Sequence, residues 1–441
     1  MVKAVVKLTS PVPLIVVVGL FILQVFAPAP AIMFTLVAIG GVMGISYLWA
    51  RQLAKGVSLH RQRRYGWAQV GDILEERFIM HNDGWVPILW AEIRDLSDLP
   101  GYNASRAVGM SARSTLRWTT SGVCERRGIY TLGPIRIYMG DPFGLFRITI
   151  YHNYQETFVV YPPIAALPPL VEPQGMARGA SRANIRSLDL TTNASSVRQY
   201  VPGDALKRIH WRSTARRSFP GHEEIFVKEF DLEPSGDLWI LLDMDADVHV
   251  GEGPESTEEY AVILAASLAN QLLRENHAVG LLTYQKEPII VPPQKGPHQL
   301  WEILRVLAGA YAIAPASLND LFELFEPLTG RGLSALIITP SADANWIKGL
   351  SILLRHGVHL SGLLLDARSF GGEGDVQGVL GALADLRVSA HVISQGFTFE
   401  RITPKREQRP QFKVLGTGRV IMVSPGESSE WVPVGQKDQT S

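Results

Sequence analysis

The chain has 441 residues, and its 42 basic and 42 acidic side chains give a formal net charge of zero. This length exceeds that of one ordinary domain, so we expect two or three domains. The zero net charge argues against extensive electrostatic binding of nucleic acid, which requires a surplus of lysine and arginine. Cys124 is the single cysteine, so no internal disulfide can form, and the sequence carries no sign of an oxidising compartment.

Two apolar runs near the N-terminus predict a pair of transmembrane helices, at residues 8–27 and 31–50. Each run is about 20 residues long, which is enough for a helix to cross a hydrocarbon core of about 30 Å. Pro28 and Pro30 lie between the runs and favour a reversal of the chain. Residues 1–50 are therefore predicted to form a helical hairpin. A cleavable signal peptide is the alternative, but it would not explain the second run.

The charges that flank the hairpin predict its orientation. Lys3 and Lys7 precede the first run, and a basic juxtamembrane segment, residues 51–67, follows the second run without an acidic residue. Positive flanks favour the cytoplasmic face of a membrane. We therefore expect a two-pass protein of the cell membrane, with its soluble domains and both termini in the cytoplasm.

Residues 68–162 predict a β-sandwich-like domain. Apolar and polar side chains alternate in ILEERFIMHN and in ILWAEIRDL, which is typical of half-buried strands. Asn82-Asp83-Gly84 supplies a strong turn signal between these runs. Further short β runs are broken by prolines and glycines, and we interpret the run DPFGLF as a turn that places two aromatic side chains at the edge of the sandwich.

Residues 163–235 combine a linker with a dense motif. The region opens with a proline-rich stretch, PPIAALPPLVEP, that extends over its first residues. Proline stiffens such a segment, and the glycines that follow loosen it. The motif itself reads VRQYVPGDALKRIHWRSTARR and lies just before the apolar run LWILLD.

The motif predicts a tight turn followed by a helix. Asp204, in the sequence Pro-Gly-Asp, is placed to cap that helix. We expect Trp211 and Ile209 to pack, and Arg198 and Arg216 to form buried ion pairs with carboxylates. The motif would then act as an architectural clasp that joins the linker to the next domain, and its surface could also dock a partner.

Residues 236–395 alternate predicted strands and helices. The strands are LWILLD, AVGLLTY, SALIITP, HLSGLLL and SAHVIS, and amphipathic helices such as residues 256–276 lie between them. This alternation predicts an α/β domain with a mainly parallel sheet covered on both faces. Such sheets bind ligands at the carboxyl ends of their strands. Residues 396–441 are expected to form a C-terminal extension that is partly disordered.

The motif resembles the family catalogued as domain of unknown function fifty-eight. In that family a run R-x-Y-x-x-G-D-x-x-R-x-I-x-W-x-x-x-A-R leads into a von Willebrand factor A-like domain, and RGIYTLGP and DPFGL resemble further family runs. Together with the two transmembrane helices predicted from the apolar runs, the resemblance implies a multidomain chain, with a β-sandwich-like domain and a doubly wound, mainly parallel α/β domain. The expected binding surface consists of the motif residues Arg198, Tyr200, Pro202, Gly203, Asp204, Arg208, Trp211 and Arg216.

The acids that follow LWILL are the sharpest chemical candidate. In von Willebrand factor A domains the corresponding run is D-x-S-x-S, which holds Mg²⁺ together with a hydroxyl and an acid from two other loops. Here aspartates replace both serines, and three carboxylates could hold Mg²⁺ or Ca²⁺. The alternative is a degenerate site with solvated acids. The candidate ligands are Asp243, Asp245 and Asp247, with Ser317 as the second-loop hydroxyl and Asp343 as the third-loop acid.

Common enzyme motifs do not accompany this loop. The sequence has no G-x-x-x-x-G-K-[ST] run, no G-x-S-x-G run and no paired cysteines for zinc. We therefore expect not an enzyme but a membrane-anchored cytoplasmic adaptor or chaperone-like binding protein. The family resemblance implies a MoxR-type AAA+ ATPase as its partner in the assembly or activation of a client protein. The alternative is an envelope-associated enzyme that uses a metal at the acid cluster.

Overall fold

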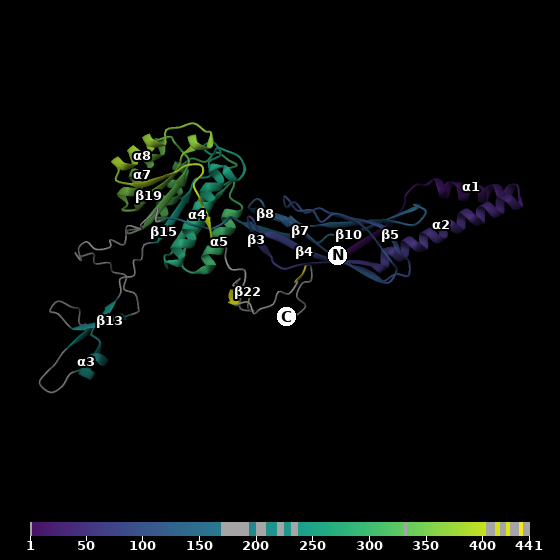
Figure 1. The fold of residues 1–441 in the computed structure, drawn as a ribbon, viewed down its shortest axis with the longest axis horizontal. Helices are drawn as coiled ribbons and strands as arrows, with labels where there is room; N and C mark the ends of the chain where they lie inside the picture. The colour runs from purple at the N-terminus through teal and green to yellow at the C-terminus, as the bar shows by residue number, and fades with distance from the viewer. Residues whose placement is uncertain are drawn as a thin grey trace. The chain divides into compact units, whose positions relative to one another are not determined.

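The computed structural model describes residues 2–168, 194–199, 209–217, 225–230, 237–329, 333–402, 411–414, 420–423 and 432–434. The chain divides into two compact units, whose elements are labelled in Figure 1. One unit comprises residues 1–164, 304–309 and 401–441, and is rich in β-strands. The other comprises residues 165–303 and 310–400, and alternates strands and helices.

Two antiparallel sheets dominate the β-rich unit. One has the strand order β1-β10-β9-β5-β6, formed by Val2–Leu8, Phe146–His152, Ile135–Gly140, Ile88–Asp95 and Arg106–Met110. The other has the order β24-β2-β4-β7, formed by Val432–Val434, Val57–Arg63, Ile73–Asn82 and Ser114–Val123. A smaller sheet, β3-β11-β8, joins Trp67–Gln69, Glu156–Tyr161 and Gly128–Leu132. Side chains of the two larger sheets share one apolar core, which includes Phe78 of β4 and Ile137 of β9.

The β-rich unit begins earlier than the sequence predicted. β1 pairs antiparallel with β10 over its whole length, from Val2 opposite His152 to Leu8 opposite Phe146. The lysines of this segment lie between apolar residues in a strand-like pattern, and pairing with β10 holds the segment in the sheet. Residues 2–8 thus form a strand before the helices, and the segment 51–67 contains the end of α2, Pro30–Gly56, and β2.

Two apolar helices are inserted between β1 and β2. They are α1, Val12–Phe26, and α2, Pro30–Gly56. Among the described helices, α2 alone is long and apolar enough to cross a membrane, as judged by length and composition, and α1 is a shorter apolar helix of 15 residues. The structure thus gives one candidate span where the sequence predicted two. The last part of α2 belongs to the β-rich unit, because its residues Ala50 and Leu53 are fully buried in the shared core.

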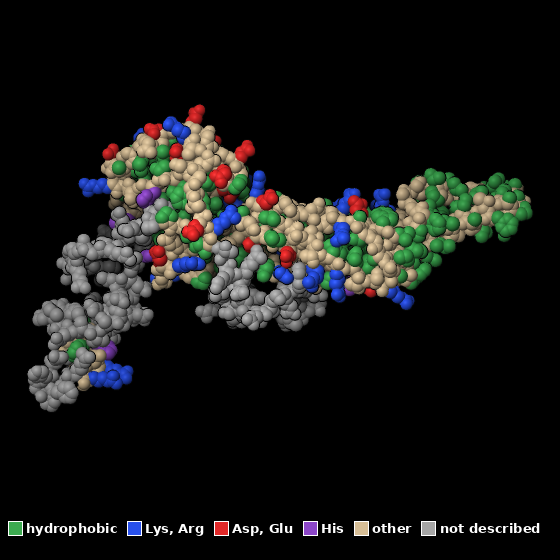
Figure 2. All heavy atoms as spheres, in the orientation of Figure 1, with side chains coloured by type: hydrophobic (Ala, Val, Ile, Leu, Met, Phe, Trp, Pro, Cys, Tyr) green, Lys and Arg blue, Asp and Glu red, His purple; other side chains and the backbone are tan. Residues whose placement is uncertain are grey.

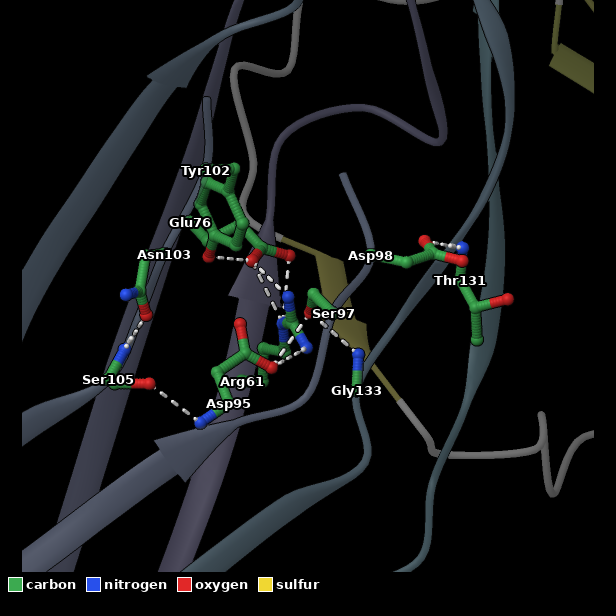
Figure 3. A network of polar contacts seen from close by, with 10 residues as sticks. All are labelled: Arg61, Glu76, Asp95, Ser97, Asp98, Tyr102, Asn103, Ser105, Thr131 and Gly133. Carbon is green, nitrogen blue, oxygen red and sulfur yellow. Dashed lines mark hydrogen bonds and ion pairs between the residues drawn. The ribbon is translucent and has the colours of Figure 1, made fainter. Parts of the chain in front are cut away.

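A buried polar cluster connects the two larger sheets (Figure 3). Arg61 Nε of β2 lies 2.9 Å from both carboxylate oxygens of Glu76 on β4, and the Tyr102 hydroxyl donates to the same carboxylate. Asp95, at the end of β5, lies 3.8 Å from Arg61 Nη1 and accepts a 2.7 Å bond from the Ser97 hydroxyl. Burial raises the pKa of Tyr102, and the charge of Glu76 raises it further, so the phenol remains a donor. Removing one half of such a pair would leave an uncompensated buried charge, so the cluster fixes the loop after β5.

The α/β unit contains a six-stranded sheet of order β17-β16-β15-β18-β19-β20. Its strands, in that order, are Pro288–Gln294, Val279–Tyr284, Leu238–Leu242, Ser334–Thr339, His359–Leu365 and Ser389–Ile393. Every neighbouring pair is parallel except β16 and β17. Its helices are α4 (Thr257–Arg274), α6 (Leu318–Phe325), α7 (Asn345–Arg355), α8 (Val376–Asp385) and the first part of α5 (Pro297–Ala308), whose residues from 304 on belong to the β-rich unit. The mainly parallel α/β sheet predicted from the alternation is present.

Helices pack on this sheet through apolar side chains. Leu241 of β15 lies in one core cluster with Phe322 of α6, Leu350 of α7 and Leu383 of α8. The Ser256 hydroxyl caps α4 by accepting from the Glu259 amide at 3.3 Å. The sheet is therefore held rigidly enough to fix the positions of the loops at its strand ends.

The motif is described only in part. Its residues Tyr200, Pro202, Gly203, Asp204 and Arg208 lie outside the described residues, as does the side chain of Arg198. β13, Ala194–Gln199, pairs antiparallel with β14, Phe226–Phe230, and α3 spans Trp211–Arg217. The turn, the helix cap and the ion pair expected of Arg198 therefore remain predictions.

The described part of the motif corrects two expectations. Ile209 is buried and bridges Val227 of β14, as expected of a packing residue. Trp211, however, is 69% exposed, and Arg216 is also exposed, so the predicted packing of Trp211 and the buried ion pair of Arg216 are wrong. The contacts to β14 come instead from Ile209 and from Thr214, whose hydroxyl accepts from the Phe226 amide at 3.0 Å.

Candidate functional site

The acid loop, residues 243–247, begins where β15 ends. β15 lies between β16 and β18 and runs parallel to both, so the carboxyl ends of three strands meet at this edge. The register pairs Leu242 with Ile338 and thereby places Asp243 beside Thr339, the last residue of β18. The Asp243 amide donates to the Ile338 carbonyl at 3.0 Å. Because the strand pairing extends to this amide, Asp243 is only 1% exposed.

The carboxyl group of Asp243 is held by the protein's own donors. The Thr339 hydroxyl donates to Oδ2 at 2.6 Å, and the Asp245 amide donates to Oδ1 at 3.0 Å. Burial raises the pKa of Asp243 to about 7; the two hydrogen bonds oppose this shift, and the charge of Asp245 adds to it. This acid therefore exchanges its proton near neutrality, well above the ordinary range of an aspartate.

A histidine connects the acid loop to the start of α4. His249 Nε2 lies 3.0 Å from the carbonyl oxygen of Asp243, and its Nδ1 lies 3.0 Å from the hydroxyl of Thr257. A carbonyl only accepts, so Nε2 carries the proton of this contact. The Thr257 hydroxyl also accepts from the Val250 amide at 2.8 Å. The loop is thus fastened at both of its ends, to β18 and to α4.

The segment before α6 packs on the same loop. The Ala246 amide donates to the Ala314 carbonyl at 3.2 Å, and the Ala312 amide donates to Glu258 of α4 at 3.2 Å. The backbone of β18 and of the segment before α6 thus bonds to the acid loop, together with the side chain of His249. The arrangement is a closed, hydrogen-bonded turn, and the buried carboxyl lies beneath it.

The five predicted metal ligands occupy different environments. Ser317 caps α6, with its amide bound to Asp320 at 2.9 Å, and Asp343 accepts from the Asn345 amide at 3.0 Å at the start of α7. Asp245 is half-buried and accepts from the amide of Asp247, which is exposed. Within the described ranges, no group of three or more His, Cys, Asp or Glu side chains is arranged to hold a metal ion.

Two residues of this site were missed in the sequence. Thr339 is the last residue of the run SALIIT, and Asp243 directly follows the run LWILL. In a parallel sheet, two such positions can meet at the same edge. That signal was available, but it requires the register of two strands nearly a hundred residues apart. His249 lies in an irregular loop, where no periodic pattern marks it.

Comparisons with known proteins agree with the resemblance seen in the motif. The uncharacterized protein YeaD of Bacillus subtilis is 29% identical over 203 residues, which cover 46% of this chain and 48% of that protein. The uncharacterized protein Rv1480 of Mycobacterium tuberculosis is 26% identical over 224 residues, with 43% and 69% covered. The matched region thus spans about half the length of the Bacillus relative.

Two solved structures are similar to parts of the chain. A von Willebrand factor type A protein from Catenulispora acidiphila has 9% identity and a TM-score of 0.27, and the match covers 36% of this chain and 39% of that one. The CARDB domain of a Pyrococcus furiosus protein has 10% identity and a TM-score of 0.18, with 24% and 91% covered. The family resemblance is confirmed by a direct match: residues 196–358 fit the family described as protein of unknown function DUF58.

Proposed function

We propose that this chain is a membrane-anchored adaptor or chaperone-like binding protein. The observation that supports this most is the apolar surface of α1 and α2, where large side chains such as Phe26 and Phe34 are 83% and 76% exposed. Figure 2 shows these helices as a continuous region of hydrophobic side chains. Soluble monomers rarely expose so large an apolar patch, and a lipid bilayer is its natural environment.

The position of the hairpin in the β-rich unit supports a single-sided anchor. β1 leads into α1, α2 leads into β2, and both strands belong to sheets of the same unit. Both ends of the hairpin must then lie on one side of the membrane. The basic flanks favour the cytoplasmic side, which would also place the α/β unit in the cytoplasm.

The acid loop supports binding rather than catalysis. Asp243 is buried, and both of its carboxyl oxygens accept hydrogen bonds from the chain itself. A catalytic acid needs access to its substrate. We therefore propose that the chain provides a membrane address and a binding surface, while a MoxR-type AAA+ ATPase, the partner suggested by the family resemblance, provides ATP hydrolysis for a client protein.

Reconstitution tests both parts of this proposal. The full chain in lipid nanodiscs should retain a purified MoxR-type ATPase during size-exclusion chromatography, whereas empty nanodiscs should not. In cells, the chain should resist alkaline carbonate extraction, and Val16→Asp combined with Val37→Asp should release it, because aspartate is costly in the hydrocarbon core. Carbonate release of the original chain would contradict the anchor, and failure to retain the ATPase with or without ATP would contradict the partner.

One observation favours a second candidate, an envelope-associated metalloenzyme. Buried acids with raised pKa values occur often at functional sites, and Asp243 is such an acid. Mg²⁺ or Ca²⁺ bound only by the folded chain would raise its melting temperature, and Asp243→Asn would abolish that rise. Since both carboxyl oxygens of Asp243 already accept hydrogen bonds from the chain, we expect no shift with either ion, and a clear shift in millimolar metal would favour the metal site.

A further inference from the structure

The free arms of the hairpin are short. α1 has 15 residues, which give about 22 Å at 1.5 Å per residue. α2 is free of the β-rich unit from Pro30 to Ile45, about 24 Å at the same rise, because its buried residues begin at Ser46. A hydrocarbon core measures about 30 Å. An anchored hairpin of this length brings the adjoining end of the β-rich unit down to the membrane surface.

Three turns of the β-rich unit adjoin the base of the hairpin. The turn between β9 and β10 is bound to the chain that enters α1, since the Thr9 amide donates to the Leu145 carbonyl at 2.8 Å. The turn between β4 and β5 is bound to the end of α2 by the Asp83 amide, which donates to Gly56 at 2.9 Å. The turn between β6 and β7 adjoins the second one, through the Arg113 amide and the Gly84 carbonyl at 3.1 Å.

Aromatic side chains are exposed in and beside these turns. Phe143 is 57% exposed, and its turn is held instead by Asp141, which accepts from the amides of Phe143 and Phe146. Trp85 is 61% exposed in the turn after β4, and Trp90, on the next strand, is 47% exposed. Tryptophan and other amphipathic aromatic side chains prefer the headgroup layer of a membrane.

Basic side chains surround the same end of the unit. Lys7 and Arg147 lie opposite each other on β1 and β10, Arg113 lies in the turn after β6, and Arg51 and Lys55 lie on the last turns of α2; all five are exposed. In the three turns the exposed acid is Asp83, while Asp141 is buried. This charge balance is complementary to anionic lipid headgroups.

We propose that this end of the β-rich unit is a membrane-binding collar, in which Phe143, Trp85 and Trp90 enter the headgroup layer and the basic side chains bind anionic lipids. The collar compensates for the short arms of the hairpin and sets the height of the unit above the membrane. The inference rests on the proposed membrane anchor and adds a lipid surface as a second contact. Its chemistry differs from that of the hairpin, so the two can be tested separately.

Cysteine labelling of the full chain in vesicles tests the collar. Cys124 is buried, and burial raises the pKa of its thiol to about 11, so a thiol reagent at neutral pH will label an introduced cysteine instead. Phe143→Cys carries a polarity-sensitive fluorophore, and Ile73→Cys, exposed at the other end of β4, is the matched control. We expect a blue-shifted label at position 143 that lipid-borne quenchers reach and aqueous iodide does not, and the reverse at position 73.

Lipid charge provides the second arm. The label at position 143 should be protected more strongly from aqueous iodide in vesicles that contain phosphatidylglycerol than in vesicles of phosphatidylcholine alone. Arg113→Glu combined with Arg147→Glu should remove that difference. Equal iodide access at positions 143 and 73 in a chain that resists carbonate extraction would overturn the collar and leave the anchor intact. Equal shielding in both lipids would overturn the anionic preference, and a chain that washes off the vesicles would overturn the anchor and the collar together.

Discussion

Asp243 is a buried acid whose protonation couples the stability of the fold to pH. Its carboxyl group accepts from the Thr339 hydroxyl and the Asp245 amide, yet burial still raises its pKa to about 7. In the unfolded chain the same group would titrate near the ordinary aspartate value of about 3.9. The folded state therefore binds this proton more tightly, and the stability that it adds at acid pH is lost as the pH rises through about 7.

Asp243→Asn should flatten this dependence. The variant cannot ionise, so the unfolding free energy of the original chain should fall relative to it by up to about 4 kcal/mol between about pH 4 and pH 8. At the acid end the variant should be about 1 kcal/mol less stable, since an amide replaces one acceptor oxygen by a donor. Denaturant unfolding of the full chain in detergent measures this difference. Asp247→Asn, at an exposed position, is the control, and parallel profiles for Asp243→Asn and the original would contradict the buried acid.

Thr339→Val should change the environment of the same carboxyl group. It removes the hydroxyl that donates to Oδ2 while keeping the shape of the side chain. An unsatisfied buried acceptor costs about 1–3 kcal/mol. The lost hydrogen bond also favours the protonated form, so the pH-dependent loss of stability should move to higher pH. Thr339→Ser retains the hydroxyl and should retain the original profile; the same melting behaviour for valine and serine would rule out the contact.

At this scale the sequence predicted the chemistry of the loop better than its geometry. The acids at the end of LWILL were recognised, but only Asp243 is buried, because its amide still continues the pairing with β18. Ser317 and Asp343 have sequences that suit a second and a third ligand loop, but Ser317 caps α6, and Asp343 accepts from the Asn345 amide just before α7. Local sequence does not distinguish these two uses, since each employs the same side-chain oxygens.

At the scale of elements, the segment around α3 shows that neighbouring motif residues have different environments. Ile209 lies in the bridge to β14, while Trp211 begins the helix and is exposed. Ile209→Ala should therefore speed the hydrogen exchange of the β14 amides by tenfold or more, given the cost of about 2–5 kcal/mol for truncating a buried isoleucine. Trp211→Ala should change the local stability by less than about 0.5 kcal/mol. Faster exchange in Trp211→Ala than in Ile209→Ala would show that the tryptophan packs after all.

The helix α2 has two environments along one element. Leu53 is fully buried in the core of the β-rich unit, whereas Leu48, little more than one turn earlier, is 56% exposed. Leu53→Ala should lower the unfolding free energy of that unit by about 2–5 kcal/mol. Leu48→Ala, the matched control, should change it by less than about 0.5 kcal/mol, because surface truncations rarely cost more. Urea unfolding in detergent, followed by far-ultraviolet circular dichroism, compares the two, and equal losses would place both residues in one environment.

For the whole molecule, the α/β unit was predictable and the β-rich unit was predictable only in kind. Apolar runs of LWILL and SALIIT type each define a parallel strand by themselves, since they are buried on both faces. β1 escaped prediction because it is short, next to an apolar run, and paired with β10 from more than a hundred residues away. The length of the helical arms that lie outside the sheets depends on the pairing of β1 with β10. No local sequence pattern reveals that pairing.

The same pairing makes a prediction for the topology of the whole chain. β1 and β2 belong to sheets of one unit, so the residues before α1 and after α2 must lie on the same side of a membrane. An impermeant thiol reagent should label Lys3→Cys and Arg64→Cys from the cytoplasmic side alone, while buried Cys124 does not react. Pro28→Cys, between the helices, should be reached from the opposite side if the hairpin crosses the bilayer and from neither side if it ends within it. Labelling of Lys3→Cys and Arg64→Cys from opposite sides would be incompatible with β1 in the sheet, and would require the N-terminal strand to leave β10 in the membrane-bound protein.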